Sequence, residues 1–285
     1  MIFLLTTGIS CERPNPSFSP QEGGSSYSDG VHKDYYESGT LREITTYRNG
    51  RLNGEVKSFD KSGHLQNHLN YKEGKRNGKA FEYYPDGRIK TKSFYQDDNL
   101  HGTVKSYYDF GDIHFETQYR NGNKHGKEKE YGPGEKLLYM SEFKNGKRDG
   151  LLKAYRDGGQ LWYEEEYKNG VPEGVFREYY LSGELYLTMN KINGQQHGMM
   201  RTFHKNGRLM REWFAVNGAG HGVSREFHLD GRLKSQGTYK NGKLDGKFEI
   251  YKDGRVYIED FYESGRSVQH KVYDQYGEVE FETGL

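Results

Sequence analysis

The chain has little of the residue types that define several common protein classes. Its single cysteine, Cys11, among 285 residues excludes an intrachain disulfide and a cysteine-rich zinc site. No stretch reaches the ~20 apolar residues that a membrane-spanning helix needs. Basic and acidic side chains number 42 and 41, and the resulting net charge of +1 provides no global field that would favour nucleic acid.

Hydrophobic residues are also scarce, at 32% of the chain, whereas aromatic residues and glycine are abundant. Low hydrophobicity alone is typical of disordered chains, but such chains are poor in aromatic residues. Here aromatic residues reach 15%, with 25 tyrosines, and there are 38 glycines. This composition favours a folded chain with little deep core, in which aromatic side chains lie on half-buried sheet faces.

The abundant residues recur with a period of 24. The phrase "YKNGKLDG" at 239–246 returns as "YRNGRLNG" at 47–54 and "YKNGVPEG" at 167–174. A glycine ladder runs Gly54, Gly78, Gly102, Gly126, Gly150, Gly174, Gly198, Gly222 and Gly246. An aromatic ladder runs from Tyr35 through Tyr83 and Tyr155 to Tyr251, and a Leu/Ile ladder from Leu41 to Leu233. A period without insertions over this length indicates a repeat array.

Each repeat contains two turn signals and two short strands. Asn-Gly pairs favour type I′ hairpin turns, because both residues tolerate positive φ. The second turn, such as "PDGR" at 85–88, also contains a glycine. We therefore predict an all-β fold: an elongated, single-layer antiparallel array of about ten stacked β-hairpins, ~10 Å per repeat. We expect the aromatic and Leu/Ile ladders to pack along one side of it.

The recurring pattern Y-x-N-G-K-x-x-G-x-x-x-x-Y-x-x-x-G-x-L resembles the bacterial variant of the MORN repeat, found in YwqK-family antitoxin proteins. The resemblance covers about 31–281 and implies a hairpin-built binding scaffold without established catalytic residues. The segment "FYESGRSVQHKVYDQYGEVEF" at 261–281 lacks the Asn-Gly turn. Residues 31–285 are therefore expected to form the array, with an atypical C-terminal cap, as terminal repeats commonly do.

Residues 1–30 differ from the repeats. The apolar run "MIFLLTTGIS" precedes Cys11, and a Pro/Ser/Gly-rich stretch follows it. This order resembles a bacterial lipoprotein, with a signal and lipobox, lipidation at Cys11 and a flexible tether. Gly8 departs from the usual lipobox Leu, and the segment lacks a positive n-region. The alternative is a disordered cytoplasmic tail with an incidental thiol.

Candidate chemical sites are few. Four histidines precede ladder glycines, but adjacent ones would lie ~10 Å apart, too far to share a metal ion. The acidic run "YEEEY" at 163–167 alternates between the two faces of a strand and implies no cleft. No nucleophile–base motif or phosphate-binding loop is present. We expect no catalytic residues, no cofactor and no metal site, so the chain is not expected to be an enzyme.

A column of basic residues lies two positions before the aromatic ladder, on the same strand face. Such a stripe beside aromatic rings could bind an extended anionic partner. The alternative is a solvated face whose cations pair with acids on adjacent strands. The proposed basic stripe comprises Lys105, Lys129, Lys153, Arg177, Arg201 and Arg225.

We expect the function to be the presentation of a regular surface to a protein partner, as in antitoxin or immunity proteins, with the chain itself a monomer. The alternative is a surface-anchored lipoprotein module that binds envelope polysaccharide or a host protein. Nucleic acid is not an expected partner, and a membrane is expected only through a lipid anchor at Cys11. The bacterial cell envelope is the expected location, and the cytoplasm is the alternative.

Bulky residues interrupt the pattern in the fifth to eighth repeats, which identifies 150–215 as the expected partner-binding region. Positions that vary between repeats are free for recognition, and aromatic and Met side chains are common contact residues. The alternative is that they pack inside a curled array. The candidate residues are Trp162, Phe176, Met199, Met200, Met210, Trp213 and Phe214.

Replacing Trp162, Met200 and Trp213 in turn by Ser or Thr tests this assignment. We expect each change to weaken binding of the partner, because a large contact side chain is removed. Affinity is to be measured together with the melting temperature. Unchanged affinity with a lowered melting temperature would instead assign these side chains to packing.

Overall fold

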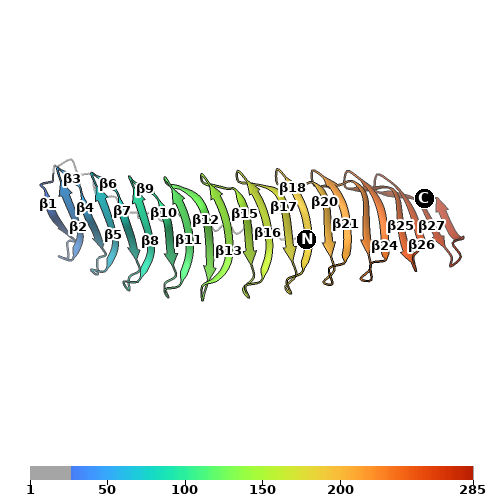
Figure 1. The fold of residues 1–285 in the computed structure, drawn as a ribbon, viewed down its shortest axis with the longest axis horizontal. Coiled ribbons are helices and arrows are strands. Elements are labelled where there is room, and N and C mark those ends of the chain that lie inside the picture. Colours follow the sequence, from blue (N-terminus) through green and yellow to red (C-terminus); the bar gives the residue numbers. More distant parts are fainter. Residues whose placement is uncertain (1–26, 285) are drawn as a thin grey trace. The chain divides into compact units, whose positions relative to one another are not determined.

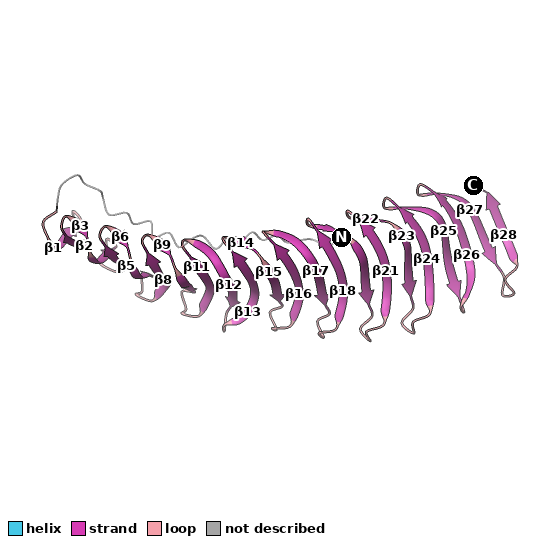
Figure 2. Ribbon diagram, turned by 45° about the horizontal axis from the view of Figure 1, so that its top comes forward, coloured by secondary structure: helices cyan, strands magenta, loops and turns pink. Residues whose placement is uncertain are grey.

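The computed structural model describes residues 27–284, a range that leaves out Cys11, the predicted lipobox and most of the tether. The chain divides into two compact units, of which unit 1 ends at Gly146 and unit 2 begins at Lys147. No helix occurs among residues 27–284, and strands connected by short turns make up the described part of both units (Figure 1 and Figure 2).

In unit 1, consecutive strands pair antiparallel and form five hairpins within the described residues. The two-residue strands β3, β6 and β9 each lead directly into the next strand. The strands are β1 (Gly30–Tyr35), β2 (Leu41–Arg48), β3 (Arg51–Leu52), β4 (Gly54–Phe59), β5 (Leu65–Lys72), β6 (Lys75–Arg76), β7 (Gly78–Tyr83), β8 (Ile89–Gln96), β9 (Asn99–Leu100), β10 (Gly102–Tyr107), β11 (Ile113–Arg120), β12 (Asn123–Gly132) and β13 (Lys136–Lys144).

Unit 2 follows the same scheme, with six hairpins in its described part. Its strands are β14 (Lys147–Arg148), β15 (Gly150–Tyr155), β16 (Leu161–Lys168), β17 (Val171–Tyr179), β18 (Leu185–Ile192), β19 (Gln195–Gln196), β20 (Gly198–Phe203), β21 (Leu209–Val216), β22 (Ala219–Gly220), β23 (Gly222–Phe227), β24 (Leu233–Lys240), β25 (Lys243–Lys252), β26 (Arg255–Glu263), β27 (Arg266–Tyr273) and β28 (Val279–Gly284). The predicted all-β antiparallel array of stacked hairpins is confirmed.

The Asn-Gly turns have the predicted conformation. Asn49 and Gly50 have φ values of 51° and 67°, as a type I′ turn requires. Asp97 and Asp98 adopt the same left-handed pair, at 47° and 65°, without a glycine. Asp tolerates this region better than most residues, which explains how one repeat departs from the Gly ladder.

The second turn of most repeats is a three-residue loop with a left-handed glycine, and the β12–β13 and β25–β26 loops depart from this form. In the turn after β4, the amide of Gly63 donates to the carbonyl of Asp60 over 3.0 Å, and the amide of Asp60 donates to the carbonyl of His64 over 2.9 Å. Gly63 has a φ of 87°. This is a type I turn followed by a G1 bulge, and it reverses the chain with the twist that the sheet requires.

A second bulge follows every Asn-Gly turn. Tyr47 lies opposite Leu52, but Ile44 lies opposite Lys57, so the β3–β4 side holds two more residues than β2. The amide of Asn53, inside this bulge, donates to the carbonyl of Thr46 over 2.8 Å. Bulges of this kind bend a strand and redirect its side chains.

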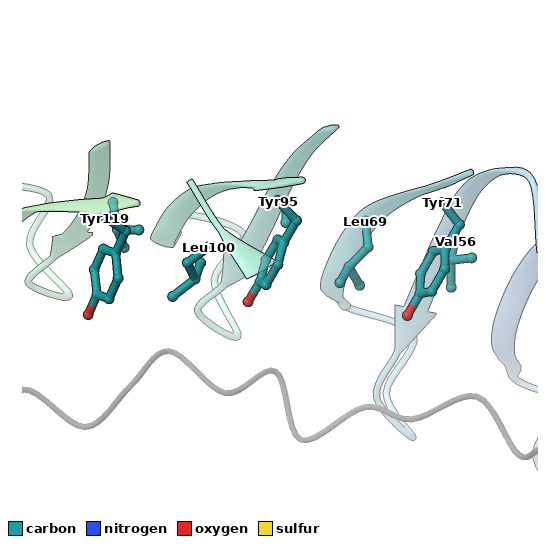
Figure 3. Packing of buried hydrophobic residues seen from close by; sticks show 8 residues of the cluster. Val56, Leu69, Tyr71, Tyr95, Leu100 and Tyr119 are labelled. Atoms are coloured by element: carbon teal, nitrogen blue, oxygen red, sulfur yellow. The ribbon is translucent and has the colours of Figure 1, made fainter. Parts of the chain in front are cut away.

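One face of the sheet in unit 1, here called the core face, holds a continuous cluster of buried side chains. Val56 and Leu69 lie directly opposite each other and are 0% and 1% exposed. Figure 3 shows the cluster side chains on one side of the strands, and its members are Val56, Leu69, Tyr71, Ala80, Tyr95, Leu100, Val104 and Tyr119. The opposite face is called the outer face.

The tyrosine that opens the recurring phrase belongs to the core cluster, since Tyr71, Tyr95 and Tyr119 are buried in it. The predicted aromatic and Leu/Ile ladders, in contrast, are not the centre of the core. Phe59 and Leu65 face each other at the end of their hairpin and are only half-buried. The core lies farther from these loops, at mid-strand pairs such as Val56–Leu69 and at the tyrosines next to the Asn-Gly turns.

Successive repeats are joined by hydrogen bonds at both ends of the strands. At one end, the amide of Gly74 in an Asn-Gly turn donates to the carbonyl of Leu52 in the preceding repeat over 2.8 Å, and Gly194 does so to Pro172 over 2.9 Å. At the other end, tyrosine hydroxyls donate to carbonyls 23 residues later, as Tyr84 does to Tyr107 over 2.8 Å. The turns therefore stack and do not merely connect strands.

Substitution of Gly218 by Ala tests the strain assigned to the Asn-Gly turns. Gly218 has a φ of 82° and open space where the alanine methyl would lie, so only backbone conformation opposes the change. We expect a loss of about 1 kcal/mol in unfolding free energy, seen as a lower midpoint of urea denaturation. Gly220 lacks a positive φ, and its added methyl would meet Tyr239 at an ordinary 3.8 Å. Gly220→Ala should therefore not lower the midpoint and should raise it slightly, because alanine reduces the freedom of the unfolded chain. An equal loss in both variants would contradict the assignment.

Candidate partner-binding site

In unit 2, the face that carries the buried side chains of Leu152, Leu187 and Ala215 is likewise called the core face, and a row of large side chains crosses it. Phe176 lies opposite Met189, and Met200 lies opposite Trp213. All four are half-buried, and continuing the β18–β20 register by one residue places Met189 opposite Met200. The corresponding positions of unit 1 hold smaller residues, including Val56, Ala80 and Val104. The row is therefore a continuous apolar ridge across β17, β18, β20 and β21.

A buried charge cluster lies beside this row. Glu165 is 7% exposed and accepts hydrogen bonds from the hydroxyl of Tyr167 at 2.9 Å and from Nζ of Lys191 at 2.6 Å. Nζ of Lys191 also lies 5.0 Å from the centroid of the Phe176 ring. Burial, together with the adjacent Glu165 carboxylate, raises the pKa of Tyr167 well above its ordinary value. These contacts hold the ridge in place, and Lys191 compensates the negative charge of Glu165 within the chain.

The outer face of unit 2 carries a separate apolar patch. Met199 lies opposite Phe214, one residue along each strand from the Met200–Trp213 pair. Because successive strand side chains alternate between faces, Met199 and Phe214 point away from the ridge. Met199 is half-buried, whereas Phe214 and four further side chains are exposed, and the outer patch is defined as Val171, Ile192, Met199, Phe214, Val216 and Val223.

Trp162 and Met210 occupy a third environment, the bulges at the starts of β16 and β21. Ala154 pairs with Tyr163 and Tyr155 with Leu161, which leaves Trp162 without a partner across the strand. Trp162 is 41% exposed, and its Nε1 donates to the carboxylate of Glu178 over 3.2 Å. Met210 is half-buried in the equivalent bulge.

The seven candidate residues are thus divided between two faces and the bulges, and only Met199 and Phe214 belong to the outer patch. Partner contact by Trp162, Met200 and Trp213 stays a prediction, separate from the outer patch. The sequence contained the signal for this division, because Met199–Met200 and Trp213–Phe214 are consecutive pairs within strands. Sequence analysis also missed Val171, Ile192, Val216 and Val223. The signal for Val171, Ile192 and Val216 was the loss of Lys or Arg, which other repeats carry beside the Asn-Gly turn, whereas the position of Val223 varies between repeats.

The basic stripe lies on the outer face, interleaved with carboxylates. Glu164 is approached by Nζ of Lys153 at 3.5 Å and by the guanidinium of Arg177 at 3.0 Å. Glu212 is likewise paired with two stripe residues, Arg201 at 3.4 Å and Arg225 at 3.3 Å. In unit 1, Lys105 pairs with Glu116 at 3.9 Å, and Lys129 lies opposite Glu116 in the strand register. The stripe is an alternation of charges and not a field of one sign.

Glu164 illustrates how this alternation acts on ionisation. Burial raises the pKa of Glu164, but hydrogen bonds from Arg177 and Tyr179 and the charge of Lys153 outweigh that effect and lower the pKa below its ordinary value. The hydroxyl of Tyr179 donates over 3.1 Å. The folded state therefore favours the ionised carboxylate, which stabilises the protein when the pH is neutral.

Within residues 27–284, no group of three His, Cys, Asp or Glu side chains is placed to hold a metal ion. The histidines before the ladder glycines use their backbone amides in the bulge, as His197 does toward the carbonyl of Asn190 over 3.0 Å. The same stretch of chain contains no helix that could span a membrane.

Glu164→Gln should lower stability in a pH-dependent manner. The stabilisation by ionised Glu164 is present above the unfolded pKa of about 4.3 and is lost as the pH falls through the lower folded pKa. We expect a loss of about 1 kcal/mol at pH 7 that disappears at pH values below the folded pKa, measured from urea midpoints over a pH series. Glu280, exposed in β28, provides the control Glu280→Gln, which should show no such trend. A deficit independent of pH would contradict the ion-pair explanation.

Comparison with solved structures gives only remote similarity. The crystal structure of TarM matches 35% of this chain and 18% of the TarM chain, with 16% identity and a TM-score of 0.20. A crystal structure of TcdB2-TccC3-Cdc42 matches 89% of this chain and 18% of that chain, with 10% identity and a TM-score of 0.19. This chain thus spans about a fifth of these proteins, and TM-scores this low support no argument about fold. A search of the curated proteins found no significant match.

Comparison with protein families is decisive. The MORN repeat variant matches seven segments, 28–49, 52–73, 76–97, 100–121, 124–145, 148–169 and 220–241, which together make up more than half of the chain. The MORN repeat itself matches 236–247. The matched segments follow one another with the 24-residue period seen in the turns and strands. The chain belongs to the MORN repeat family, in its variant form.

Proposed function

We propose that the chain is a non-enzymatic repeat scaffold that binds a protein partner through the outer patch of unit 2. The observation that carries this proposal is the concentration of exposed apolar side chains on one face of β17–β23. Val171, Ile192 and Val223 are 41%, 46% and 41% exposed. Contiguous apolar groups exposed in this way commonly mark sites of protein association.

The equivalent repeat positions of unit 1 carry basic residues instead of apolar ones. Where unit 2 has Ile192 and Val216, unit 1 has Lys72 and Arg120. At an exposed end of a strand, Lys and Arg side chains are well solvated and prevent unwanted association with other proteins. Their replacement by aliphatic residues in successive repeats favours a recognition role for this stretch over a role in stacking, because stacking is already provided by the turns.

The resemblance to YwqK-family antitoxins suggests a finer form of the proposal, in which the partner is a toxin that the scaffold covers. Lipid anchoring through Cys11, which would place the scaffold at the cell envelope, concerns residues outside 27–284. The patch chemistry is compatible with either location, since it requires only that the partner present apolar side chains.

The double variant Ile192→Lys/Val216→Lys tests the proposed function. Lysine occupies this position in other repeats, at Lys72, Lys168 and Lys240, so the sheet should accept it. We expect the affinity of the tagged full-length variant for its partner to fall about 30-fold, as it does when interface hot spots are removed. The measurement is quantitative mass spectrometry of crosslinked complexes from native cells, followed by affinity determination with the purified partner.

The matched control is Phe94→Lys. Phe94 is 41% exposed on the outer face of unit 1, in the repeat position that corresponds to Phe214. This control should capture the partner as the unmodified chain does. Equal capture by the unmodified chain, the double variant and the control would refute binding at the outer patch.

A further inference from the structure

The residues beside the Asn-Gly turns form a line across the outer face of unit 2, and its chemistry changes along its length. Lys168 lies opposite Val171, Ile192 opposite Gln195, Val216 opposite Ala219, and Lys240 opposite Lys243. In strand order the line therefore reads Lys168, Val171, Ile192, Gln195, Val216, Ala219, Lys240 and Lys243. Its centre is largely apolar and both ends are basic.

The lysines at the ends differ from those of the basic stripe. Lys168, Lys240 and Lys243 are exposed, and none of them makes an ion pair with another described residue. Nearby carboxylates are already engaged with backbone amides. Glu166 accepts from the amide of Val175 at 3.2 Å, and Glu173 accepts from the amide of Asn193 at 3.0 Å. The positive charge at both ends of the line is thus available to a partner.

The spacing of the line matches one kind of secondary structure. Lys168 and Lys240 are three repeats apart, which corresponds to about 30 Å at two strands per repeat. An α-helix of about 20 residues has the same length. Seven helical residues rise about 10.5 Å, which is close to the ~10 Å step between repeats. A helix with apolar residues at heptad spacing would therefore place one apolar residue against each successive repeat.

We infer that the partner docks an amphipathic helix of about 20 residues across this line, with apolar residues at its centre and carboxylates at both ends. The inference rests on the proposed function and specifies the partner's chemistry. The apolar side chains would cover Val171, Ile192 and Val216. The carboxylates would meet Lys168 at one end and Lys240 with Lys243 at the other.

A protein segment suits this surface better than an anionic lipid surface. Gln195 and Asn190 are exposed within the patch, and their side-chain amides have no hydrogen-bond partner among the described residues. Insertion into hydrocarbon would remove water from these amides without replacement, which is unfavourable. A helix can present polar side chains between its apolar positions, and these can form hydrogen bonds with the amides of Gln195 and Asn190.

Three synthetic helical peptides of about 20 residues provide the test. They share Leu at heptad positions and differ at both ends, which carry Glu, Gln or Lys. Binding to the purified full-length chain is followed by fluorescence anisotropy over a range of salt concentrations. We expect the Glu-ended peptide to bind about tenfold more tightly than the Gln-ended peptide at low salt, with a preference that fades as salt screens the lysines.

Charge reversal in the chain provides the matched comparison. Lys168→Glu/Lys240→Glu/Lys243→Glu should make the Lys-ended peptide the preferred ligand. Lys72→Glu/Lys75→Glu changes the corresponding positions of unit 1 and should leave the original preference intact.

Equal binding of the three peptides, a Glu preference that survives the reversal, or binding only to vesicles of anionic phospholipid would overturn the inference. If that occurs while Ile192→Lys/Val216→Lys still abolishes capture of the natural partner, the scaffold function stands and only the partner's chemistry is wrong. Peptide selectivity as expected, with unchanged capture by that double variant, would support the docking line and refute its use by the natural partner.

Discussion

The left-handed turn that each Asn-Gly pair forms is the constraint on which both units depend. Its positive φ values permit a two-residue reversal, and its glycine amide then reaches a carbonyl of the preceding repeat, as Gly146 does with Lys124 over 2.8 Å. The bond is kept even where Gly265 follows Gly242 by 23 residues, since the amide of Gly265 donates to the carbonyl of Leu244 over 2.7 Å. The stacking of turns therefore depends on this bond, whereas the loop at the opposite end of the hairpin accommodates a change of one residue.

Because the turns and the strand ladders satisfy the backbone, side chains at mid-strand are comparatively free to vary. Val56 opposes Leu69 in unit 1, whereas Met200 opposes Trp213 at the equivalent place in unit 2. A single sheet has no second layer against which such volumes must fit, so neighbouring rows can accommodate them. Variation in this protein accordingly does not by itself identify a binding residue, and exposure on a given face has to be known as well.

The fold was largely predictable from sequence, because the Asn-Gly pairs, the second glycine and the aromatic spacing each specify local structure. The location of the core was not, since the register shifts by one residue between Ser58 and Phe59 and takes the ladder residues out of the alternation that buries Val56 and Ser58. For the candidate site, the region was indicated by bulky residues such as Phe214. The division of the candidate residues between two faces follows from the alternation of side chains along a strand. The contribution of Ile192 and Val216 follows from the absence of Lys or Arg at their positions beside the turn.

Charge has opposite consequences at two places on the same outer face. Arg201 and Arg225 share the carboxylate of Glu212, so the stripe rich in cations presents little net field and acts mainly between strands. Lys240 and Lys243 are directly opposite each other beside a turn, where no carboxylate reaches them among the described residues. Two adjacent like charges destabilise a strand pair unless something else compensates. Lys72 and Lys75 form the same opposed pair beside a turn of unit 1, so like charges alone do not distinguish the proposed docking line. What distinguishes it is the exposed apolar stretch with Ile192 and Val216 between its lysines, which the helix inferred above would cover.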